Sequence, residues 1–266
     1  MSVRASELSA ESYVRSVEER RERSRVALHG PASELAAVAR HQLPVGSRLR
    51  FGSGRGVDVP LAGVGRAIEV RATEDGFVVD GEPGGPRQIE LGRFRLRLSH
   101  QNAPAVVVLD SESPRLREDV ERRWYPVDPR LRFVTRLEAD HERGTVASTN
   151  SADRAAERLG WLPVVIDGMP VRVAAMRLLE PGYADGHIDV YFRDATTGHG
   201  SYEVGRYLTV EPDGDAYVLD FNLAYNPSCA LSPYYNCPIP PRENHLSVPI
   251  RAGEMSPLVR PEATPA

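Results

Sequence analysis

The feature that most constrains this chain is the spacing of its apolar residues, which changes once along the sequence. Over residues 6–28 they recur at helical spacing, with Tyr13, Val14 and Val17 on one face. After residue 30 helical spacing is nearly absent, and from about Pro44 apolar and polar residues alternate in short runs. The sequence therefore predicts a mainly β protein with one N-terminal helix.

The alternating runs fall into two groups. The first predicts strands at 48–51, 67–72, 77–80, 88–91, 94–98 and 105–109, with Asp75-Gly76 and Asp80-Gly81 as turns. The second predicts a hairpin across 162–179 that turns at Asp167-Gly168, and strands at 131–137, 145–147, 187–192, 202–210, 217–221 and 246–250. We expect a small β-sandwich followed by a larger β-sandwich or barrel.

A connector separates the two groups, because residues 111–130 lose the alternation and contain three prolines. The domain organisation that follows has five parts. They are an N-terminal helical brace at 1–43, the small β-sandwich at 44–110, the connector at 111–130, a C-terminal β domain at 131–255 and a loose tail at 256–266.

Composition excludes several classes of function. All 33 cationic side chains are Arg, so Schiff-base and P-loop lysine chemistry is impossible. The net charge of -4 provides no overall positive field for nucleic acid. No stretch reaches the roughly 18 apolar residues of a membrane helix, and residues 1–25 lack the apolar core of a secretory signal. We expect a cytoplasmic protein with no nucleic-acid or membrane partner, and the oligomeric state stays open.

Polar residues interleave with aromatic ones between Phe192 and Glu254. Four of them crowd the end of the strand predicted at 217–221, namely Asp220, Asn222, Tyr225 and Asn226. Several hydrogen-bonding groups must therefore converge where this strand leaves the core. The five prolines that follow, at 227, 233, 238, 240 and 241, indicate a rigid loop.

Four motifs in this segment carry a family resemblance. They are GRYL at 205–208, LDFNLAYNPSCA at 219–230, CPIPPRENHL at 237–246 and IRAGE at 250–254. Together they resemble the bacterial domain-of-unknown-function family numbered 1684. His245 departs from it, since Arg is expected after the Asn of that motif. The resemblance implies bacterial origin and a mainly β fold, and it brings no activity with it.

Arg206 is the first candidate binding residue. It lies in a strand pattern, where an inward Arg requires a carboxylate partner, and Asp220 and Glu203 are nearest by pattern. Its guanidinium either fixes strand register or binds an anionic ligand in a forked geometry. In the second case it lines a pocket of the C-terminal domain for a small polar or anionic molecule. The predicted ligand-binding residues are Arg206, Tyr207, Asp220, Asn222, Tyr225 and Asn226.

The two cysteines allow other interpretations. Cys229, Cys237 and His245 follow the spacing C-x7-C-x7-H, which is atypical of zinc sites, so neither a metal nor another cofactor is expected. The thiols are then small buried apolar groups or a disulfide.

An enzymatic alternative uses Cys229 as the nucleophile of a hydrolase or acyl transferase. His199 or His245 would be the base, and Asp220 or Asn222 the orienting group. A third possibility is a protein-interaction module that presents loops of residues 44–110. Whether the chain is an enzyme stays open.

Overall fold

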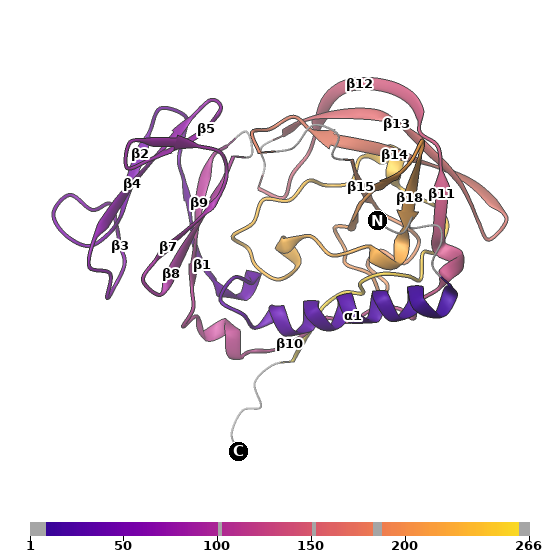
Figure 1. The fold of residues 1–266 in the computed structure, drawn as a ribbon, viewed down its shortest axis with the longest axis horizontal. Helices are drawn as coiled ribbons and strands as arrows, with labels where there is room; N and C mark the ends of the chain where they lie inside the picture. The colour runs from indigo at the N-terminus through magenta and orange to yellow at the C-terminus, as the bar shows by residue number, and fades with distance from the viewer. Residues whose placement is uncertain (1–8, 101–102, 151–152, 183–187, 261–266) are drawn as a thin grey trace, which may run out of the picture.

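The computed structural model describes residues 9–100, 103–150, 153–182 and 188–260 (Figure 1). It is mainly β with one N-terminal α-helix, as the residue spacing predicts. The sheets that the described residues build are all open, so none closes into a barrel. The parts of the predictions that concern residues 6–8, 187 and 261–266 lie outside the described residues.

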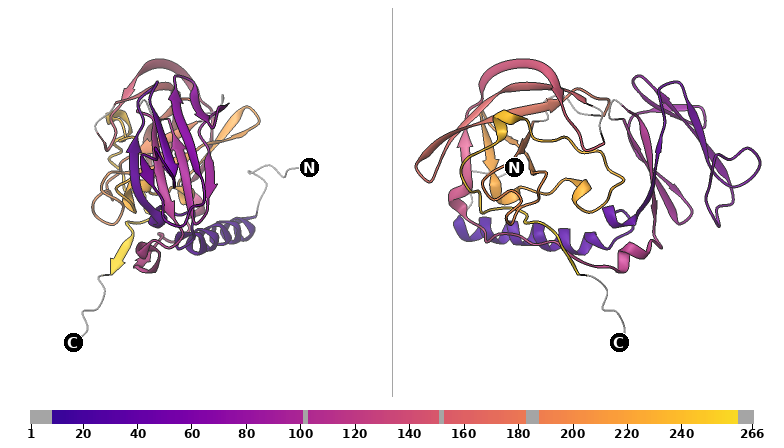
Figure 2. Two further views of the ribbon diagram at one scale, coloured as in Figure 1. Left: turned by 90° about the vertical axis from the view of Figure 1, so that its left-hand side faces the viewer. Right: turned by 180° about the vertical axis from the view of Figure 1, so that it is seen from behind.

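The N-terminal helix α1 (Ala10–Leu28) lies along the C-terminal unit, as both Figure 1 and the rear view in Figure 2 show. It buries Tyr13, Val17 and Arg21, which are spaced four residues apart. The Tyr13 hydroxyl donates to both carboxylate oxygens of Asp220 at 2.8 Å, 207 residues later in the chain. The helix therefore docks on the body of the protein.

Two sheets pack face to face in the N-terminal unit, with strand orders β1-β9-β8-β7 and β3-β2-β4-β5-β6. Along β8 the apolar Phe94, Leu96 and Leu98 point inward and share one core with Phe51 and Ile68 of the other sheet. This arrangement is a small β-sandwich. Its strands are β1 (Ala37–Gln42), β2 (Arg48–Gly52), β3 (Val59–Pro60), β4 (Ala67–Thr73), β5 (Gly76–Val79), β6 (Glu82–Gly84), β7 (Gln88–Leu91), β8 (Phe94–Ser99) and β9 (Ala105–Asp110).

Strands also form in the regions expected to be brace, connector and tail. β1 lies inside residues 1–43 and pairs antiparallel with β9. β19 (Leu258–Arg260), in the expected tail, pairs antiparallel with β10 (Asp119–Glu121), in the expected connector. The Arg260 guanidinium forms ion pairs of 2.9 Å with Asp119 and Glu121. Local sequence does not reveal these strands, because β1 has no alternating burial and the other two have three residues each.

The C-terminal unit contains a five-stranded sheet, β12-β13-β14-β15-β16, and a three-stranded sheet, β11-β18-β17. One core joins them, with Leu162, Val190 and Leu208 from the larger sheet and Leu219 from the smaller. Their strands are β11 (Arg132–Thr135), β12 (Glu138–Val146), β13 (Arg154–Ile166), β14 (Met169–Leu178), β15 (Asp189–Phe192), β16 (Arg206–Thr209), β17 (Glu211–Asp213) and β18 (Ala216–Asp220).

The hairpin predicted at 162–179 is present, and it turns at Asp167-Gly168, where Asp167 has a φ of 48°. The strand predicted at 246–250 is wrong, since these residues form no strand. Short 3-10 helices connect the strands. They are η2 (Glu34–Ala36), η3 (Pro114–Arg117), η4 (Pro129–Leu131), η5 (Phe221–Leu223), η6 (Ser228–Ala230) and η7 (Arg242–Asn244). No helix in the described part of the chain is both long and apolar enough to cross a membrane.

Candidate functional site

Arg206 is fully buried on β16 and binds groups of the protein itself. Its guanidinium forms an ion pair of 3.2 Å with Asp194, not with Asp220 or Glu203. It also donates to the carbonyl oxygens of Ile250 at 2.8 Å, Glu254 at 3.3 Å and Ala252. Burial lowers the pKa of Arg206, and Asp194 opposes that effect. Arg206 thus ties the 205–208 motif to the 250–254 motif and fixes the position of Glu254.

Asp220 belongs to a different network. Besides the Tyr13 hydroxyl, it accepts hydrogen bonds from the backbone and side-chain nitrogens of Asn222, both at 3.1 Å. The Arg132 Nε lies 3.6 Å from it. Burial raises the pKa of Asp220 above its ordinary value. Arg206 and Asp220 therefore do not meet around one hollow, and Asp220 fastens α1 to β18.

Of the remaining predicted residues, Tyr207 and Tyr225 pair with each other, and Asn226 bonds Glu254. Tyr207 and Tyr225 exchange two backbone hydrogen bonds of 2.9 Å, and their rings meet edge to face at 5.9 Å. The Asn226 backbone nitrogen donates to the Glu254 carboxylate at 2.6 Å, and its side chain donates to the Met255 carbonyl oxygen at 2.7 Å.

A cavity of about 160 Å³ lies between α1 and the C-terminal unit, and Asn222 and Tyr225 line it. Arg206 is not among its lining residues. Three other arginines are, namely Arg20, Arg21 and Arg122. Apolar and aromatic groups complete the wall, among them Val17, Trp124, Leu223 and Ala224. We call this space the helix cavity.

Among the arginines of the helix cavity, Arg21 has the most buried nitrogens without an acceptor. Its side chain is only 6% exposed, and Nη1 pairs with Glu18 at 3.0 Å. Its Nε and Nη2 are almost inaccessible to solvent and have no acceptor among the described residues. Burial lowers the pKa of Arg21, and Glu18 offsets part of that shift. A buried donor without an acceptor costs about 1–3 kcal/mol, and the Trp124 ring, whose centre lies 6.0 Å from the guanidinium carbon, offsets part of that cost.

Arg122 and Glu254 also line the helix cavity. Arg122 lies 3.0 Å from Glu34 and 3.3 Å from Glu254, and it also donates to the Ser24 hydroxyl at 3.0 Å. Glu254 is 2% exposed, and burial raises its pKa. Two carboxylates thus balance Arg122, while the exposed Arg20 has no ion pair in the described ranges.

Sequence reasoning missed the charged half of the helix cavity. Arg21 lies four residues after Val17 and eight after Tyr13, so the helical stripe points to it once charged residues are included. Arg122 and Trp124 fall in the predicted connector, where no pattern marks them.

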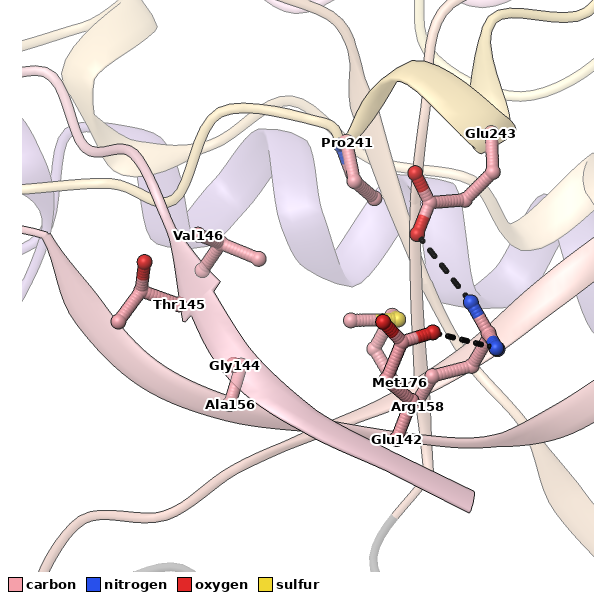
Figure 3. Close-up of a pocket in the computed structure, with 9 residues that line it drawn as sticks. All are labelled: Glu142, Gly144, Thr145, Val146, Ala156, Arg158, Met176, Pro241 and Glu243. Carbon is pink, nitrogen blue, oxygen red and sulfur yellow. Dashed lines mark ion pairs between the residues drawn. The ribbon is translucent and has the colours of Figure 1, made fainter. Parts of the chain in front are cut away.

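A larger cavity of about 350 Å³ lies between strands β12 and β13 and the loop that carries η7 (Figure 3). Arg158 is its main cation, and it is already surrounded by Glu142 at 2.7 Å, Asp140 at 3.1 Å and Glu243 at 3.9 Å. None of the described residues that line it has a buried polar atom without a partner. This cavity therefore has fewer unpartnered hydrogen-bond donors for an anion than the helix cavity has.

Neither of the predicted bases, His199 and His245, hydrogen-bonds the Cys229 thiol among the described residues. The groups that hydrogen-bond this thiol include Cys237, Tyr202 and Thr149, and neither His199 nor His245 is among them. His245 Nε2 lies 3.3 Å from the Pro240 carbonyl oxygen instead. The part of the chain that the structure describes also contains no group of three or more His, Cys, Asp or Glu side chains that could hold a metal ion.

Fold and site together define a mainly β protein whose N-terminal helix closes an arginine-lined cavity. The chain belongs to the family described as "Protein of unknown function (DUF1684)", whose model matches residues 121–255. The match includes Arg122, Asn222, Tyr225 and Glu254, whereas α1 lies before it.

Two further comparisons add little about function. A solution NMR structure of an uncharacterised protein from Haloarcula marismortui is 34% identical, with a TM-score of 0.41. The similarity covers 50% of this chain and 75% of that one. No curated protein matches.

Proposed function

We propose that this protein binds a small organic anion, with a carboxylate group, in the helix cavity. The observation that carries the proposal is Arg21, a guanidinium that is almost fully buried and has two nitrogens without an acceptor. Buried polar groups are nearly always hydrogen-bonded, so one that is not requires an explanation. An anion oxygen beside Arg21 provides the missing acceptor.

The charges around the cavity favour an anion. Glu34 and Glu254 balance Arg122, but Glu18 leaves two nitrogens of Arg21 without a partner, and Arg20 has no ion pair among the described residues. The Arg21 nitrogens are covered, so an anion reaches them through a small rotation of the side chain toward the cavity. A carboxylate can accept two parallel N–H groups from a guanidinium, which makes the pair both strong and specific.

The size and lining of the cavity favour an organic anion over free phosphate. Its volume of about 160 Å³ is below the usual range for drug-sized ligands, so it admits a molecule of a few heavy atoms. Val17, Leu223 and Ala224 are apolar, and Trp124 and Tyr225 add aromatic surface. A short carboxylic acid matches both parts of this wall.

The proposed ligand class is the one predicted from the sequence, but the charged residues that would bind the ligand are different. Asn222 and Tyr225 stay in the site, whereas Arg206 and Asp220 support it from neighbouring networks. Neither His199 nor His245 is among the described hydrogen-bond partners of Cys229, and the cysteine-dependent hydrolase or acyl transferase and the interaction module of residues 44–110 stay predictions. Bacterial origin and a cytoplasmic location also stay predictions.

The test is ligand-induced stabilisation of the full chain. Acetate, propionate, malonate and phosphate are added at equal ionic strength, and the melting temperature is followed. A ligand at 100 times its Kd stabilises the fold by about 2.7 kcal/mol. We expect a carboxylate to raise the melting temperature of the wild type.

Arg23→Met is the matched control, because Arg23 is exposed on the same helix and does not line the helix cavity. It should retain the carboxylate-induced shift, while Arg21→Met should lose it. Equal shifts in all three proteins would mean that the anion binds elsewhere. A shift with phosphate alone would refute the organic ligand class.

A further inference from the structure

Two thiols meet in the proline-rich segment after β18. Cys229 lies half-buried on η6, and Cys237 is buried eight residues later. Both are free, and each thiol shifts the pKa of the other, as expected of two sulfurs that lie close together. Cys229 packs against the apolar cluster that contains Cys237. Since the two sulfurs are already neighbours, a bond between them requires only local movement.

The surroundings of the two sulfurs differ. The Tyr202 hydroxyl lies 3.4 Å from the Cys229 carbonyl oxygen and 4.0 Å from the Cys229 Sγ, and it can donate to either. The Thr149 hydroxyl accepts a 3.0 Å hydrogen bond from the Cys237 backbone nitrogen. The hydrogen bond from Cys237 lowers the pKa of Cys229, and the same bond together with burial raises the pKa of Cys237. Thiolate character and exposure decide which cysteine reacts first, so Cys229 is the attacking sulfur.

We propose that Cys229 and Cys237 form an oxidation site, at which a hydroperoxide converts the two thiols into one intramolecular disulfide. This inference does not rest on anion binding in the helix cavity.

The chemistry has two steps. The Cys229 sulfur attacks the hydroxyl oxygen of the hydroperoxide, the O–O bond breaks, and a sulfenic acid forms on Cys229. The departing oxygen takes the Cys229 proton and leaves as water or an alcohol. The Cys237 sulfur then attacks the Cys229 sulfur, so that the S–S bond forms and the S–O bond breaks. The released hydroxide takes the Cys237 proton and leaves as water. Two electrons pass from the sulfurs to the hydroperoxide.

The disulfide would close a ring around a segment that contacts the small β-sandwich. Tyr235 lies inside that ring, and its hydroxyl accepts a 2.8 Å hydrogen bond from Arg97 on β8. Arg40 on β1 lies 3.4 Å from the Tyr234 carbonyl oxygen. Both tyrosines also pack against an apolar cluster formed by η2, β1 and β9. Oxidation would therefore restrict the segment that joins the two units.

The experiment treats the full chain with hydrogen peroxide at neutral pH, stops the reaction with iodoacetamide and digests it with trypsin. Both cysteines fall in one tryptic peptide, 207–242, because no Arg or Lys lies between Arg206 and Arg242. Without a reductant, we expect the peptide from the oxidised protein to be two hydrogens lighter than the reduced peptide and to carry no alkyl group on either cysteine. An added dithiol should restore both.

Single serine variants separate the two steps. In Cys237→Ser the sulfenic acid on Cys229 should persist and react with dimedone. In Cys229→Ser the buried Cys237 should be alkylated at least about tenfold more slowly than Cys229 in Cys237→Ser. If a variant fails to fold, the rate at which peroxide forms the disulfide in the wild type tests the proposal by itself. It is overturned if peroxide leaves both thiols alkylatable, if Cys229 becomes sulfinic acid beside a free Cys237, or if the bridge links two chains.

Discussion

Replacing Arg21 with Met should stabilise the protein when no anion is bound. Leaving a buried donor without an acceptor costs about 1–3 kcal/mol, and Arg21 has two such donors. The substitution also removes the Glu18 ion pair, and helix pairs of this spacing contribute only about 0.2–0.5 kcal/mol. Met and Arg have similar helix propensity, so the helix itself is unaffected. The contact of the guanidinium with the Trp124 ring, at 6.0 Å, is lost as well and contributes about 0.5–1 kcal/mol. The net gain is therefore at least about 0.5 kcal/mol.

Thermal unfolding followed by circular dichroism measures this gain. For a chain of this size about 1 kcal/mol corresponds to 2–4 °C, so the melting temperature should rise by at least about 1–2 °C. The exposed Arg23→Met change should stay within about 0.5 kcal/mol of the wild type. If Arg21→Met instead unfolds at a lower temperature than Arg23→Met, the two nitrogens have acceptors and the argument for the anion site fails.

Three further outcomes follow from the networks beside the helix cavity. Arg206→Met leaves the buried Asp194 carboxylate without its cation, and should lower the free energy of unfolding measured in urea by about 3–5 kcal/mol. A loss below about 1 kcal/mol would show that Asp194 finds another partner. Gly253→Ala should destabilise the fold, because Gly253 has a φ of 74° and an added Cβ would lie 2.7 Å from the Ala224 oxygen. Carboxylate binding measured by calorimetry should also weaken. Unchanged binding would contradict this prediction. Burial raises the pKa of Asp220, so Asp220 contributes its full stabilisation below its ordinary pKa of 3.8 and loses it as pH rises through the raised value. The melting temperature of Asp220→Asn minus that of the wild type should therefore increase above pH 4. A difference that stays constant with pH would refute this reasoning.

The sequence alone determined the fold class and most of the strands. Alternation at residues 94–98 predicts β8, and Asp167-Gly168 predicts the turn of the long hairpin, because side-chain period and turn chemistry are local properties. The short strands β10 and β19 escape such patterns, since three residues cannot show a period. They form only because distant segments meet.

The candidate site shows the same division more sharply. The sequence predicts Asn222 and Tyr225 as ligand-binding residues, and both line the helix cavity because they follow one strand end. It also paired Arg206 with the wrong carboxylates, since Asp194 reaches it through the neighbouring strand β15. Only the tertiary structure laid α1 across the C-terminal unit and brought Arg21 beside Arg122. Whether a charged side chain can bind a ligand depends on its burial and on its partners in the folded protein, and both are set by residues far away in the chain.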